Sequence, residues 1–132
     1  MNRTRDQFRT TSLLTLVRST LRQHHSDNSK AYKISTVDAL MSGLVVFSLK
    51  QPSLLQFDQE NKPGKTLFHN LQTLYGVKHA PCDTQMRKRL DGLQLEGIRE
   101  SMKAVVGCLQ RGKELENWKF IEGSYLVPLD GT

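Results

Sequence analysis

Apolar residues recur at intervals of three and four along most of this 132-residue chain, which is the spacing of one face of an α-helix. The clearest examples are two series, Leu67, Leu71 and Leu74, then Leu95, Ile98, Met102, Val105 and Leu109. The pattern predicts about six helices, near residues 11–23, 36–49, 53–60, 66–75, 83–90 and 95–111. We therefore expect a mainly α-helical bundle.

The second helix is the most apolar one. It opens at Ser35, which with Asp38 three residues later resembles a capping box, with Asp in place of Glu. Its expected core stripe consists of Val37, Leu40, Met41, Leu44 and Phe47. Pro52 then marks a restart, because proline is well placed in the first turn of a helix. This third helix is expected to bury Leu54, Leu55 and Phe57.

A helix, a turn and a basic helix occupy residues 75–90. Gly76 follows an apolar helical run and predicts its end, because glycine adopts the left-handed backbone conformation without steric cost. Asp83 stands where a carboxylate can accept the first backbone N–H groups of the next helix. Met86 and Leu90 supply the apolar side, which leaves the run 87–89 pointing outward. This is the plan of a helix-turn-helix-like element that lays one helix against nucleic acid.

After Lys113 the apolar period changes from that of a helix to that of a strand. Alternating residues are Trp118, Phe120, Tyr125, Val127 and Leu129, and Gly123-Ser124 fits a two-residue hairpin turn. The apolar run ends at Asp130, followed by glycine. A carboxylate at a strand end is a common place for a metal ligand. An isolated hairpin is only marginally stable and has two unpaired edges, so a chain that ends just as a sheet begins is expected to be incomplete.

The charge is positive and unevenly distributed. The formal charge is +6, with a pI near 9.6, and nucleic acid is the commonest acidic partner of such proteins. Residues 1–33 carry seven Lys/Arg against two acids, and residues 78–103 carry six against four. Residues 34–77 are neutral, with three of each. Two basic flanks around a neutral apolar centre favour contact with phosphates by the flanks.

Other motifs exclude several functions. Cys82 and Cys108 have no metal-ligand spacing, which indicates neither a zinc finger nor a disulfide framework and fits a cytoplasmic setting. His24 and His25 are expected in an exposed loop. Asn61–Thr66, NKPGKT, lacks the first glycine of a phosphate-binding loop and is expected to be a turn. The longest apolar stretch, 40–49, is far shorter than the roughly 18 residues that cross a bilayer.

Three segments carry a family resemblance. LMSGLVVFSLKQPSLLQFD, HNLQTLYGVKHAPCDTQMRKRLDGL and the final YLVPLDGT, over about residues 36–132, resemble the N-terminal part of bacterial insertion-sequence transposases of the DDE, RNase H-like class. The resemblance implies a helical, DNA-binding domain over 1–112. It also implies the truncated start of an RNase H-like catalytic domain over 113–132, with the hairpin beginning its sheet.

The resemblance also implies a catalytic role. In such transposases the first of three metal-binding carboxylates ends this strand, which places that role on Asp130. The acids of the full enzyme bind Mg²⁺ for DNA transposition and recombination. Because the second and third carboxylates are absent here, this chain alone is expected to be inactive and to need no cofactor. Pro128 would break the ladder of a central strand.

DNA is the expected partner. Arg87, Lys88 and Arg89 are expected to contact phosphates, whereas Thr84 and Gln85, in the first turn of the basic helix, are better placed to reach base edges. The N-terminal arginines Arg3, Arg5 and Arg9 are candidates for a backbone-following arm. Two alternatives stay open. One is a small helix-turn-helix regulator, and the other is a protein-interaction module that pairs two copies of the chain through residues 95–109.

Overall fold

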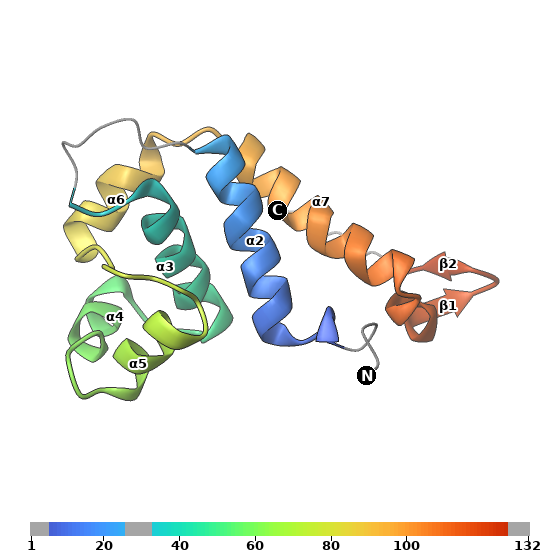
Figure 1. The fold of residues 1–132 in the computed structure, drawn as a ribbon, viewed down its shortest axis with the longest axis horizontal. Coiled ribbons are helices and arrows are strands. Elements are labelled where there is room, and N and C mark those ends of the chain that lie inside the picture. Colours follow the sequence, from blue (N-terminus) through green and yellow to red (C-terminus); the bar gives the residue numbers. More distant parts are fainter. Residues whose placement is uncertain (1–5, 26–32, 127–132) are drawn as a thin grey trace.

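The computed structural model describes residues 6–25 and 33–126 and confirms a mainly helical chain with a short antiparallel hairpin (Figure 1). Within those residues the elements are α2 (Thr10–His24), α3 (Thr36–Ser48), α4 (Leu54–Glu60), α5 (Thr66–Thr73), α6 (Asp83–Asp91), α7 (Glu96–Arg111), the 3₁₀ helix η1 (Glu114–Trp118), β1 (Lys119–Ile121) and β2 (Ser124–Tyr125).

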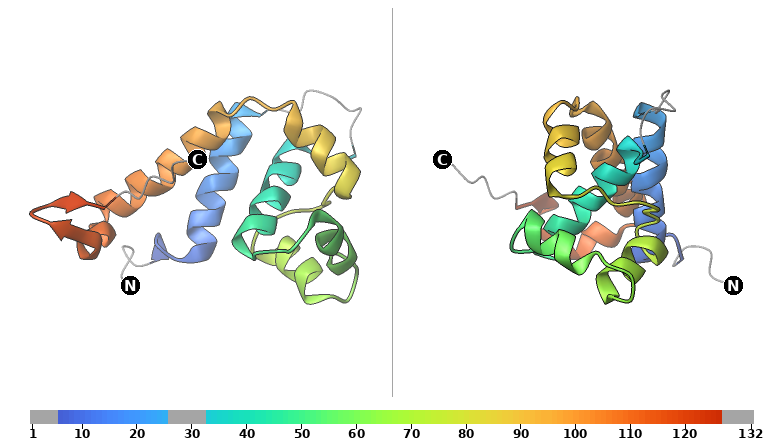
Figure 2. Two further views of the ribbon diagram at one scale, coloured as in Figure 1. Left: turned by 180° about the vertical axis from the view of Figure 1, so that it is seen from behind. Right: turned by 90° about the vertical axis from the view of Figure 1, so that its left-hand side faces the viewer.

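The helices form two groups. α3 lies between α2 and the cluster of α4, α5 and α6, whereas α7 packs along the other side of α2 and carries the hairpin away from that cluster (Figures 1 and 2). The hydrophobic core is shared by α2, α3, α4, α5, α6 and the segment that follows α5. The basic helix and the hairpin therefore lie at opposite ends of the molecule.

α3 is the centre of the core. The Ser35 side chain accepts a hydrogen bond from the Asp38 backbone N–H at 3.0 Å, which confirms Ser35 as the helix cap. The expected single stripe was wrong at Phe47, which is 81% exposed, whereas Val45 and Val46 are buried. The reason is that α3 has neighbours on more than one side, so burial does not follow one stripe.

α4 and α5 are short helices, and α4 places one buried residue in the core whereas α5 places two, Leu67 and Leu71. Ser53 caps α4 by accepting from the Gln56 backbone N–H at 3.0 Å, so Pro52 lies ahead of the helix and not in its first turn as expected. Phe57 is fully buried, but Leu55 is 57% exposed, contrary to expectation. The NKPGKT segment is a turn, as expected, with Gly64 at a φ of +87°.

α2 and α7 approach each other closely near the C-terminal end of α2. Gly97 is buried, and a Cβ atom there would collide with His25 and His24. The exposed loop expected for this histidine pair was right only in part. His24 is exposed but is the last residue of α2, whereas His25 follows the helix but is half-buried beneath α7. Of the apolar series on α7, Ile98 packs against the core, so the series serves in part as an internal contact.

The hairpin is present, but its turn lies one residue earlier than expected. Glu122 and Gly123 occupy the turn with φ values of +34° and +84°, and Ser124 already belongs to β2. Two consecutive positive φ values match the twist of a tight hairpin. Trp118 belongs to η1 and not to a strand. The strand residues are exposed, and none of them belongs to the hydrophobic core.

Candidate nucleic-acid interface

α6 is oriented by its apolar side. Met86 is fully buried, and Leu90 packs half-buried against the same core, as the sequence predicts. Thr84, Gln85 and Lys88 are consequently exposed. The connection from α5 crosses residues 74–82, longer than the three or four residues of a compact helix-turn-helix. Gly76 in this connection has a φ of +64°, which confirms the left-handed stop.

Asp83 is the first residue of α6 and pairs with Arg87. Its carboxylate accepts from the Arg87 Nε atom at 2.7 Å, and no side-chain hydrogen bond caps the helix. The expected capping role of Asp83 was therefore wrong, although a carboxylate in the first turn still opposes the helix dipole. This hydrogen bond and the charge of Asp83 raise the pKa of Arg87.

Arg89 points inward, contrary to the outward orientation expected for it. Its guanidinium donates to the Ile34 carbonyl oxygen at 2.5 Å and to the Thr36 hydroxyl at 3.2 Å. These bonds tie α6 to the segment in front of α3. Arg89 thus sets the distance between two parts of the chain that are far apart in sequence.

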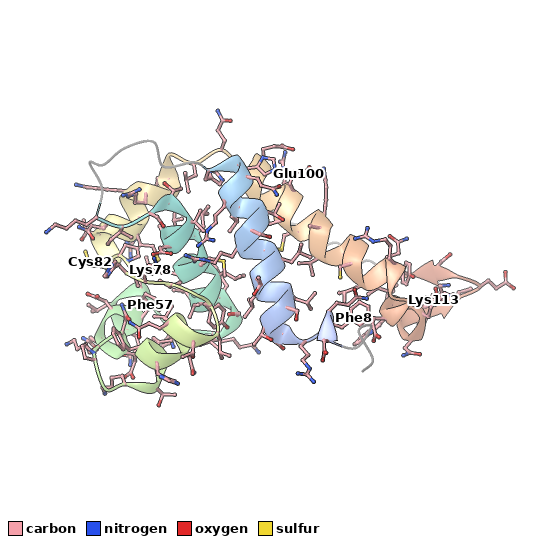
Figure 3. All side chains as sticks on the ribbon, viewed as in Figure 1. Phe8, Phe57, Lys78, Cys82, Glu100 and Lys113 are labelled. Carbon is pink, nitrogen blue, oxygen red and sulfur yellow. The ribbon has the colours of Figure 1, made fainter. Side chains whose placement is uncertain are left out.

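Asp38 holds the segment between α5 and α6 in place. Its carboxylate accepts from the Arg18 guanidinium at 2.7 Å and from the backbone N–H groups of Lys78 and His79 at 3.2 and 3.3 Å. The Asp38 side chain is 6% exposed and that of Arg18 is 13% exposed, so the pair is almost dry. Asp38 therefore connects α2 and α3 to the segment 77–80. Lys78 lies on the α6 side of the molecule, opposite the hairpin (Figure 3).

These contacts create a groove beside α6. Its volume is about 860 Å³, and it is lined by Lys33, Ile34, His79, Ala80, Pro81, Gln85, Lys88 and Arg89. No Asp or Glu belongs to this lining of described residues. We call this surface the α6 groove. Lysine, arginine and glutamine donors around an acid-free groove are suited to an anionic ligand.

The structure brings together only some of the predicted site residues. Gln85, Lys88 and Arg89 share the α6 groove because spacings of three and four place side chains on one helix face. Thr84 and Arg87 do not line the groove, and they lie on the neighbouring face of α6. The DNA contacts of all five residues stay predictions.

Sequence reasoning missed Lys33 and His79. His79 lies in the predicted turn within residues 75–90, but its place in the groove depends on Asp38, which is far away in sequence. Lys33 precedes the cap of α3 and has no periodic signal of its own. Lys33 was counted in the basic flank 1–33, but a charge count does not identify which residue of the flank lies at a partner surface.

Several predicted residues lie outside the described ranges. Asp130, Arg3 and Arg5 are among them, so the proposed carboxylate and most of the N-terminal arm have no structural description here. Arg9 is exposed and pairs with Asp6 at 3.0 Å. Over residues 6–25 and 33–126 no group of three His, Cys, Asp or Glu side chains is arranged to hold a metal ion. In the same ranges no helix has the length and apolar character of a membrane span.

Comparison with known proteins identifies no relative. No protein-family model, curated protein or solved structure matches this chain. The functional inference therefore rests on the residues of α6 and its groove, together with the sequence resemblance.

Proposed function

We propose that this chain binds DNA through α6 and the α6 groove, as the DNA-binding region of a DDE-type transposase. The observation that carries the proposal is the groove beside the exposed first turn of α6, whose lining among the described residues contains Lys33, Lys88 and Arg89 and no Asp or Glu. Positive side chains contribute most of the affinity for DNA, because they displace counterions from the phosphates.

The exposed side chains of α6 divide into two roles. Lys88 contacts a DNA phosphate as a point charge. Arg87 also contacts a DNA phosphate, while its guanidinium keeps its hydrogen bond to Asp83. Phosphate contacts of this kind set position and orientation but carry no sequence information. Thr84 and Gln85 lie in the first turn, where a helix entering the major groove presents side chains to base edges. A glutamine amide fits the donor and acceptor pair of adenine.

The link to transposition comes from the sequence resemblance alone. In that proposal the helical part recognises the ends of an element, and Asp130 belongs to a Mg²⁺ site that needs further carboxylates. DNA binding by α6 requires no metal ion, so it can be tested on this chain alone. If the chain binds a palindromic DNA site but does not bind the DNA at the ends of its own locus, the alternative of a small helix-turn-helix regulator is favoured.

A second candidate function is a protein-interaction module. A hollow at the far end of α7 is lined by Val106, Gln110, Leu115, Trp118, Phe120, Tyr125 and Leu126. Trp118 is 76% exposed and Phe120 is 72% exposed. An exposed apolar patch of this kind is typical of a surface that contacts another protein. This function is compatible with DNA binding, because the hollow is lined by the end of α7 and the hairpin, and the hairpin lies away from α6 (Figure 1).

The test is fluorescence anisotropy with duplex DNA from the flanking repeats of the locus and with a scrambled duplex, at several salt concentrations. We expect Lys88→Gln to weaken binding to both duplexes and to reduce the slope of log K against log salt by about 0.9. Gln85→Ala is expected to reduce discrimination between the duplexes by about 1–3 kcal/mol.

The matched control is Lys62→Gln, which changes an exposed lysine in the turn before α5. It is expected to bind as the unaltered chain does. If neither duplex binds at low salt, the proposal is wrong. If Lys88→Gln and Lys62→Gln weaken DNA binding equally, binding depends on the overall positive charge of the protein, and α6 is not the interface.

A further inference from the structure

The α6 groove has walls that are held in place before any ligand arrives. Arg89 ties the α6 wall to Ile34, which lies 55 positions earlier in the sequence. Asp38 holds the wall that contains His79 through the backbone N–H of that residue. A site whose walls are already fixed loses little conformational entropy on binding, which favours a defined ligand over loose attraction.

The lining of the groove combines two kinds of side chain. Ile34, Ala80 and Pro81 supply apolar surface, whereas Lys33 and Lys88 supply cations from two different segments of the chain. The phosphates of a DNA duplex face outward and are hydrated, so they match the cations but gain nothing from the apolar surface. An unpaired nucleotide offers both parts, because it presents an exposed base and sugar next to its phosphate.

The size of the groove agrees with this ligand. Its volume of about 860 Å³ is within the range of roughly 300–1,000 Å³ found for sites that enclose small organic ligands. His79 is exposed on the wall of the groove and presents a flat aromatic ring. Bases that are free of a partner strand commonly stack on aromatic side chains, histidine among them.

We propose that the α6 groove binds an unpaired segment of a DNA strand. One base lies against His79 and the apolar residues of the lining, and the phosphates on either side of that base contact Lys33 and Lys88. This inference rests on the proposed function, since it names the part of the DNA that the groove takes. α6 contacts the duplex, and the groove holds the adjoining unpaired nucleotides.

The experiment compares three labelled probes by anisotropy: a blunt duplex, the same duplex with a short single-stranded overhang, and the single strand alone. We expect the overhang to tighten binding about tenfold over the blunt duplex, the gain typical of one stacked base. His79→Ala is expected to remove this gain, so that the overhang probe and the blunt duplex bind this variant with equal affinity. Lys33→Gln is expected to reduce the gain and its salt dependence.

Two matched controls use exposed residues outside the groove, His69→Ala and Lys62→Gln, and both are expected to keep the full gain. Thermal melting checks that His79→Ala and Lys33→Gln fold, which is expected because both side chains are exposed. If the blunt duplex binds and the overhang adds nothing, this inference is wrong and the proposed function stands. If neither duplex binds, the proposed function is wrong as well. Displacement of the overhang probe by polyglutamate as readily as by single-stranded DNA would also overturn the inference.

Discussion

Removing the Asp38 carboxylate is expected to destabilise the fold severely. Asp38→Ala leaves the Arg18 guanidinium, which is only 13% exposed, without its counter-ion. It also removes the acceptor for the backbone N–H groups of Lys78 and His79. Among the described residues the Nη1 atom of Arg18 already has no hydrogen-bond partner, so no second acceptor is ready to replace Asp38.

The expected loss follows from the burial of the pair. Breaking a buried ion pair by removing one partner costs about 3–5 kcal/mol, because the remaining charge stays desolvated. Whole domains have unfolding free energies of only about 5–15 kcal/mol. Arg18→Met is expected to cost less than Asp38→Ala, because the carboxylate would keep its two backbone N–H donors. The double variant is expected to cost less than the sum of the two single variants.

Urea denaturation, monitored by circular dichroism, measures the unfolding free energy of the unaltered chain, the two single variants and the double variant. A coupling energy of about 0.5–3 kcal/mol between Asp38 and Arg18 is expected for residues in direct contact. The reasoning is refuted if Asp38→Ala costs below about 1 kcal/mol, or if the two single effects simply add. Folded Asp38→Ala is also expected to lose the preference for an overhang, since the wall that contains His79 is no longer anchored.

Two further predictions concern a glycine turn and a surface ion pair. Gly76→Ala is expected to lower the unfolding free energy by about 1–2 kcal/mol, because φ is +64° and the new Cβ would lie 3.3 Å from the Cδ of Arg18. Gly92→Ala, at a φ of −95° with open space around it, is the control and is expected to stay within about 0.5 kcal/mol in thermal melts. Lys103→Gln is expected to raise the pKa of Glu100 in a carboxyl NMR titration, because the Lys103 hydrogen bond is the main cause of its lowered value. A carboxyl group whose pKa is lowered by folding stabilises the fold above its unfolded pKa, and this stabilisation is lost as pH falls through its folded pKa. The assignment of the Glu100 shift to Lys103 would be contradicted if the unaltered chain and Lys103→Gln differed in stability by the same amount in acid and at neutral pH.

The helices were largely predictable, and the exceptions have a common physical cause. The spacing of Leu67 and Leu71 records a helix face directly, and both residues are buried as expected. Phe47 continues an equally good spacing but is exposed, because burial depends on which neighbours surround α3. Leu55 fails for the same reason in α4. Periodicity identifies a helix more reliably than it identifies the positions that other helices will cover.

The candidate site was predictable only in part. Gln85 and Lys88 were named from the basic helix, and both line the α6 groove. The inward turn of Arg89 depends on the Ile34 carbonyl, which no local pattern reveals. Lys33 and His79 went unnoticed because each is an ordinary polar residue in its own segment.

Interactions between close neighbours in the chain already specified the helices, the Ser35 cap, the left-handed stop at Gly76 and the basic character of α6. Such features depend on backbone geometry and side-chain chemistry within a few residues, so they are present in the order of amino acids. The groove arises differently, because its walls come from residues 33–34, 79–81 and 85–89. Asp38 and Arg89 join those segments across 41 and 55 positions, and only folding brings donors and acceptors so distant in sequence within hydrogen-bond reach.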